Sequence, residues 1–145
     1  MRSLAVIATA GVLALSLSGC FGNPVENIVE GVIENQTGID VDVDSDGSGA
    51  SLPEGWPAEV PTPAGTIVSS FAADDVYSAT ITVADEAAAL AGLDAIKAAG
   101  FTSDAESDLG QLKSYVLNNG TLGVTYAILD DSGTITVTIG VAPRN

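Results

Sequence analysis

Alternation of apolar and small polar side chains dominates the C-terminal part of the chain and constrains its fold more than any other feature. Such runs cover residues 111–118, 121–130 and 134–141. Because successive side chains of a strand point to opposite faces of a sheet, this period of two predicts strands with one buried and one solvated face. Asn119-Gly120 is a strong hairpin signal, and Asp131-Ser132-Gly133 suits a second turn. The sequence therefore predicts three consecutive antiparallel strands here.

Two more strands and one helix are expected upstream. Residues 66–71 and 76–83 read as strands joined by a turn. Asp85 suits a helix N-cap, and Gly100 suits the end of a helix that runs to about residue 99. The predicted buried stripe of this helix is Ala89, Leu90, Leu93 and Ile96.

The predicted order is β-β-α-β-β-β, which is an α+β fold. In its simplest form, a small antiparallel sheet of about five strands carries the helix on its apolar face and turns threonine and serine to water. The stretch from Gly100 to Gly110 is expected to be a connection. Thr134, Thr136 and Thr138 resemble the arrays of ice-binding sheets, but threonine also favours the wet face of a strand, and we prefer that interpretation.

The charge balance and the lack of histidine exclude several classes of function. The 145 residues contain 19 acidic and 4 basic side chains, a net charge of −15, and no histidine. Without histidine, no Ser-His-Asp or Cys-His catalytic arrangement exists. An acidic surface repels phosphate backbones, so no nucleic-acid partner is expected. One small domain with appendages is expected at this length.

The first twenty residues have the organisation of an export signal. Arg2 precedes an apolar run over residues 4–17, and small residues follow. The run is shorter than the ~20 apolar residues that span a membrane comfortably. Its end, Leu17-Ser18-Gly19-Cys20, resembles the lipobox of bacterial lipoproteins, and the Ala, Gly, Asp and Val richness resembles such proteins of high-GC Gram-positive bacteria. The alternative is a plain secretory signal with an incidental cysteine.

The lipobox resemblance implies a modification and a location. Cleavage between Gly19 and Cys20 would leave Cys20 carrying a thioether-linked diacylglycerol, with an N-acyl chain in many bacteria. Two or more acyl chains anchor a protein stably, whereas one does so only marginally. The resemblance therefore implies a cell-membrane lipoprotein held on the extracytoplasmic side. Cys20 is the only cysteine, so no internal disulfide is available to this chain.

A short amphipathic helix is expected after the anchor. Its apolar residues have helical spacing, and Pro24 and Gly38 suit its two ends. The apolar stripe consists of Val25, Ile28, Val29, Val32 and Ile33. A helix lying on a membrane normally carries lysine or arginine on its polar face, but this one carries Glu26, Glu30 and Glu34. We therefore expect it to pack on protein; the alternative is a frayed helix within the tether.

Residues 45–65 contain four prolines at spacings that exclude a helix, and they read as a linker or as a segment lying over the domain. Trp56 within this segment has two interpretations. It either fixes the segment onto the core or forms part of an aromatic surface that binds peptide or sugar. We favour the first.

The stretch 39–47, IDVDVDSDG, matches the first half of an EF-hand-like calcium loop. Asp42, Asp44 and Asp46 would supply oxygens, with Gly47 at the turn. The second half fails, because Ala50 and Pro53 occupy positions where oxygen ligands are needed. We favour a short strand with Ile39, Val41 and Val43 pointing inward and the aspartates toward water. A calcium-dependent binding or adhesion module remains the first alternative function.

A small hydrolase that uses paired carboxylates is the second alternative, because glycoside hydrolysis needs only two acids. The candidate groups are Asp74 with Asp75, Asp85 with Glu86, Asp104 with Glu106 and Asp108, and Asp130 with Asp131. Each lies at a predicted turn or helix start, where aspartate bonds to the backbone. We therefore predict no catalytic residue, no metal site and no cofactor.

The sequence thus predicts four parts: a signal peptide over 1–19, a lipidated N-terminus with helix and acidic strand over 20–44, a Pro/Gly-rich linker over 45–65 and an α+β domain over 66–145. The expected function is non-enzymatic binding or assembly in the cell envelope. The expected partners are the membrane, through Cys20, and an unidentified envelope protein or glycan.

Overall fold

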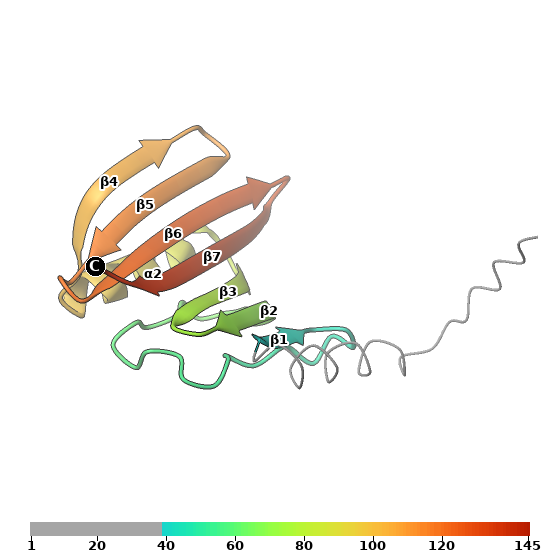
Figure 1. The fold of residues 1–145 in the computed structure, drawn as a ribbon. Coiled ribbons are helices and arrows are strands. Elements are labelled where there is room, and N and C mark those ends of the chain that lie inside the picture. The colour runs from blue at the N-terminus through green and yellow to red at the C-terminus, as the bar shows by residue number, and fades with distance from the viewer. Residues whose placement is uncertain (1–38) are drawn as a thin grey trace, which may run out of the picture.

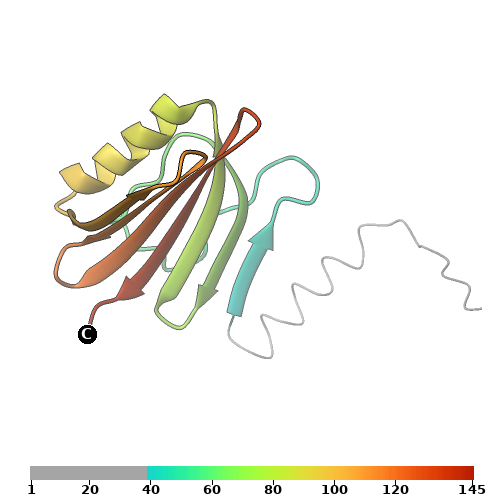
Figure 2. The ribbon, with the colours of Figure 1, turned by 90° about the horizontal axis from the view of Figure 1, so that it is seen from above.

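The computed structural model describes residues 39–145, and all of their strands belong to one antiparallel sheet (Figure 1). Seven strands lie in the order β1-β2-β3-β7-β6-β5-β4. The strands are β1 (Ile39–Val43), β2 (Thr66–Ala73), β3 (Val76–Val83), β4 (Thr102–Asp108), β5 (Leu112–Asn118), β6 (Leu122–Asp131) and β7 (Thr134–Pro143). One helix, α2 (Glu86–Ala98), connects β3 to β4 and lies along one face of the sheet (Figure 2).

The predicted fold class is wrong, because the described chain is mostly a seven-stranded sheet rather than an α+β fold with about five strands. The stretch expected to connect Gly100 to Gly110 contains β4, whose residues are all exposed. A strand without a buried face shows no apolar alternation, so its sequence carries no strand signal. In addition, β1 pairs with β2 and extends the sheet at its other edge.

The predicted helix and the five predicted strands are present with small shifts at their ends. Asp85 caps α2, and its side chain accepts a hydrogen bond from Ala88 N at 2.8 Å. Gly100 follows the helix with a φ of 102°. The predicted stripe needs one correction: Gly92 is buried where α2 meets the sheet, and Leu90 is exposed.

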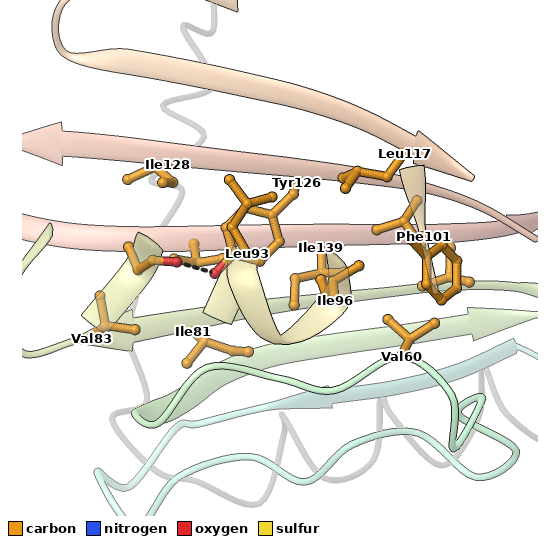
Figure 3. Packing of buried hydrophobic residues seen from close by; sticks show 14 of the residues in the cluster. Val60, Ile81, Val83, Leu93, Ile96, Phe101, Leu117, Tyr126, Ile128 and Ile139 are labelled. Carbon is orange, nitrogen blue, oxygen red and sulfur yellow. Dashed lines mark hydrogen bonds between the residues drawn. The ribbon is translucent and has the colours of Figure 1, made fainter. Parts of the chain in front are cut away.

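The core lies between α2 and the sheet, as Figure 3 shows. Leu93 and Ile96 of the helix are packed with the inward side chains of β3, β5, β6 and β7. These strand residues are Ile81, Val83, Leu117, Val124, Tyr126, Ile128, Ile135, Val137, Ile139 and Val141. Burial of branched aliphatic side chains drives this packing, in keeping with the small aromatic content of the chain.

The Pro-rich segment before β2 covers part of the same face. Its residues Val60 and Pro63 are buried. The indole nitrogen of Trp56 donates to the carbonyl oxygen of Val60 at 2.9 Å, and its ring meets Tyr77 edge-on with centroids 6.3 Å apart. The prediction that Trp56 fixes this segment onto the core is confirmed.

The orientation predicted for β1 is wrong. Asp40 and Asp42 are paired with Ala72 and Ser70, which are buried on the face toward the core. Directly paired residues share a face, so Ile39, Val41 and Val43 lie on the opposite face. The cause is the Pro-rich segment: Ser51 N donates to Asp42 at 2.7 Å, and Glu54 N donates to Asp40 at 3.1 Å.

Candidate functional site

The face of the sheet opposite α2, here called the open face, is uncharged over its central rows. One cross-strand row consists of Val41, Phe71, Ser78, Gly140, Thr125 and Val116. The next row consists of Val43, Ser69, Thr80, Thr138, Ala127 and Ser114. A third, shorter row consists of Thr82, Thr136, Leu129 and Leu112. The absence of charged side chains from these rows is unusual in a chain whose net charge is −15.

Exposed apolar side chains gather on this face. Six of the eight large hydrophobic residues that are exposed in the described chain lie there. Val43, Phe71 and Val76 are at the β1–β3 end, and Leu112, Val116 and Leu129 are at the β5–β6 end. Threonines of β3 and β7 separate the two groups. The open face therefore has two apolar ends and a polar but neutral centre.

A hollow of about 320 Å³ begins at the β1–β3 end, at β2 and β3, and extends over β7 to β6. Phe71 and Val76 line it, together with Ser78, Thr125 and small residues of β6 and β7. At Gly123 and Gly140 a Cβ would meet no atom nearer than 3.9 Å. The hollow thus exists because the sequence places glycine where a side chain would fit.

Both edges of the sheet carry carboxylates, which discourage pairing with a further strand. At the β1 edge these are Asp40 and Asp42. At the β4 edge the register shifts beside Asp104, whose carboxylate accepts hydrogen bonds from Arg144 at 2.6 Å and Asn118 at 2.7 Å. The hydrogen bond from Arg144 is the main cause that lowers the pKa of Asp104. Both edges are therefore poorly suited to pairing with a further strand.

The aspartates of the calcium alternative bond to nearby backbone. Asp44 accepts from Gly47 N at 2.7 Å, and Asp46 accepts from Ser48 N at 2.9 Å. Hydrogen bonds from Ser48 lower the pKa of Asp46. Within residues 39–145 no three acidic or cysteine side chains are grouped closely enough to hold a metal ion. Asp44 and Asp46 thus organise the turn after β1, and Asp42 accepts a hydrogen bond from Ser51 N in the Pro-rich segment.

The paired carboxylates at 74–75 and 130–131 lie beside turns, and Asp85 with Glu86 lies at a helix start. The prediction is wrong for the third group, at 104–108, which lies on strand β4. Asp74 lies in the β2–β3 turn with a φ of 52°, and Asp130 accepts from Gly133 N at 2.9 Å in the β6–β7 turn. Glu86 forms an ion pair with Lys113. The ammonium of Lys113 donates a hydrogen bond to Glu86, and this bond raises the pKa of Lys113. This pair borders a cavity of only about 40 Å³ that Asp130 also lines. The cavity has room for water rather than for a sugar ring.

The lipobox cysteine and the amphipathic stripe of residues 25–33 lie outside the described residues. Among residues 39–145, no helix is long and apolar enough to cross a membrane. Comparisons with protein-family models, curated proteins and solved structures found no match for the chain. The sequence did not predict the open face as a possible binding surface. Its residues come from strands that are distant in the sequence, and they become neighbours only through the pairing register of those strands.

Proposed function

We propose that this chain is a lipoprotein anchored through Cys20 on the extracytoplasmic side of the cell membrane, with a non-enzymatic domain that binds a protein of the cell envelope. The binding surface is the β5–β6 end of the open face, formed by Leu112, Val116 and Leu129. The anchor rests on the lipobox resemblance, and the surface rests on the sheet geometry.

One observation carries the binding surface: an uncharged sheet face with exposed apolar ends in a chain that is otherwise strongly acidic. Cores of protein–protein interfaces are depleted in charged residues relative to the remaining surface. Leu112, Val116 and Leu129 are each 39–46% exposed and lie on adjacent strands. The matching partner has a neutral, aliphatic protein surface.

The chemistry of the face favours a protein over a glycan or an anionic polymer. Phe71 is the only aromatic side chain in the three rows of the open face, so the face offers little area on which sugar rings could stack. Polymers rich in phosphate are repelled by the carboxylates at both edges. Leucine and valine side chains pack instead against apolar protein surface.

The anchor is tested by replacing Cys20 with alanine in the full-length chain. The parent is expected to incorporate an alkyne fatty acid during growth and to sediment with membranes. The Cys20→Ala variant should lose the label and should accumulate as unprocessed precursor or as released protein. Label that persists on this variant would contradict the anchor.

The binding surface is tested with a photo-crosslinking amino acid in intact cells. At Val116 it should yield a crosslink to a specific envelope protein, because this position is 40% exposed on the proposed surface. The matched control is Ala91, an exposed position of α2 on the other side of the sheet. Equal products from both positions would contradict a binding face, and a crosslink to a second copy of the chain would identify self-assembly instead.

A further inference from the structure

We propose that residues 24–34 of the same chain form a helix that packs on the hollow end of the open face, so that the sheet is covered on both sides. This inference goes beyond the proposed function and stands whether or not Cys20 is acylated. It concerns the β1–β3 end of the open face and leaves Leu112, Val116 and Leu129 free for a partner.

Two apolar surfaces in this chain need a partner, and they are complementary. Phe71 and Val76 border the hollow with exposures of 37% and 47%. The segment offers an apolar stripe of five branched residues at helical spacing over 25–33. Aliphatic side chains of a helix fill a hollow whose lining includes Gly123, Gly140 and Ala142, because these small residues permit close approach.

Chain connectivity places the segment beside the hollow. Only residues 35–38 separate it from Ile39, the first residue of β1. Four extended residues span at most ~14 Å. Ile39 pairs with Ala73 at the end of the sheet where Val76 also lies, which is the end that contains the hollow. The segment therefore reaches this site without crossing the rest of the face.

The dimensions agree as well. A helix of eleven residues is ~16 Å long. Strands in a sheet are ~4.8 Å apart, so the distance from β1 across β2 and β3 to β7 is ~15 Å. Most of the hollow lies under this span, since its lining comes from β2, β3 and β7, and only its far side comes from β6. One such helix cannot cover all seven strands, and the β5–β6 end remains open.

Charge favours this site over the two alternatives, the membrane and a second copy. Glu26, Glu30 and Glu34 follow one another at every fourth residue and lie off the apolar stripe, which opposes contact with anionic headgroups. The lining of the hollow contains no charged residue, and the nearest carboxylates along the chain, Asp74 and Asp75, lie outside it in the β2–β3 turn. A short tether gives an effective concentration in the millimolar range, which favours contact within the chain over contact between chains.

The test uses the whole mature chain, residues 20–145, with Cys20→Ser so that introduced cysteines are the only ones. Val29→Cys lies in the middle of the stripe, and Ser78→Cys lies in the hollow. A short bis-maleimide is expected to link this pair within the monomer at least tenfold faster than the control pair Val29→Cys with Asp94→Cys, because Asp94 is exposed on α2. Equal rates for the two pairs, or links only between chains, would overturn the proposal.

A second variant separates docking from folding. Ile28→Asp with Val32→Asp should remove the tenfold preference of the first pair, while residues 39–145 still melt cooperatively. Retention of the preference in this variant would also overturn the proposal. Neither outcome depends on lipidation or on an envelope partner, so failure here and failure of the proposed function are distinguishable.

Discussion

The hydroxyl of Tyr126 donates a hydrogen bond to the carbonyl oxygen of Ala89 at 2.7 Å, and this bond joins the centre of the sheet to helix α2 (Figure 3). Tyr126 has a relative exposure of 0%. Buried tyrosine needs a partner for its polar end, and a helix carbonyl with a free lone pair supplies it. The sheet and the helix are thus fixed in register by a polar contact inside an apolar core.

Removing this hydroxyl should weaken the domain. Tyr126→Phe is expected to lower the free energy of unfolding of the mature chain by about 1 kcal/mol, the usual net value of one such hydrogen bond. Urea unfolding followed by far-UV circular dichroism measures the change. Tyr115→Phe, at the half-buried cross-strand neighbour, is the matched control and should cost less.

The same residue predicts an alkaline effect. Burial raises the pKa of Tyr126 above its ordinary value of 10.0, so the folded state holds this proton more tightly than the unfolded chain does. The resulting stability is fully present below about pH 10 and is lost as the pH rises beyond it. Between about pH 10 and 11.5 the parent should lose stability more steeply than Tyr126→Phe. Parallel pH profiles for the two proteins would contradict this reasoning.

Gly92 should not tolerate alanine, although alanine is the better helix former. An added Cβ would lie 2.6 Å from the Cβ of Pro63, too close for two carbon atoms. Overpacking of this kind costs about 1–3 kcal/mol and outweighs a helix-propensity gain of up to about 1 kcal/mol. The thermal midpoint of Gly92→Ala should therefore fall. Ala91→Gly, at the exposed neighbouring position, measures the propensity effect alone.

Trp56 offers an internal probe of whether the Pro-rich segment unfolds with the sheet. Its fluorescence reports on the contact with Tyr77, and far-UV circular dichroism reports on the strands. Because Val60 and Pro63 are buried with the core, both signals should give the same melting curve. An earlier fluorescence transition would show that the segment is a separable linker.

Calcium should have no selective effect on stability. Asp42, Asp44 and Asp46 accept backbone hydrogen bonds, and added salt then acts mainly by screening a net charge of −15. Melting in calcium, in magnesium and in sodium chloride of equal ionic strength should give similar gains. Specific binding would add about 2.7 kcal/mol at a hundredfold excess over Kd. A calcium-selective gain that Asp42→Asn with Asp44→Asn removes would contradict the prediction.

The sequence predicted the elements that have a buried face and missed what depends on pairing. In β7, the apolar residues Ile135, Val137 and Ile139 alternate with polar or small ones because one face of the strand is in the core. This period of two is visible in the sequence and predicted the strand. The strand β4 is exposed on both faces and therefore has no period. The sequence could not predict which side chains of β1 point toward the core side of the sheet. Alternation shows which residues share a face of a strand, but it does not show which of the two faces the rest of the chain covers. In the structure, the backbone N–H groups of Ser51 and Glu54 donate hydrogen bonds to Asp42 and Asp40, and these bonds hold the aspartates on the core side.

The strand order also determines how this sheet is assembled in time. The units β1–β3 and β4–β7 each form a meander of sequence neighbours, whereas Tyr77 of β3 pairs with Val141 of β7, about sixty residues away. Closing a long loop costs entropy before its contacts repay it, so local hairpins form quickly and distant strands pair slowly. The β3–β7 seam therefore sets the folding barrier, and α2, which bridges the two meanders, governs how often their edges meet.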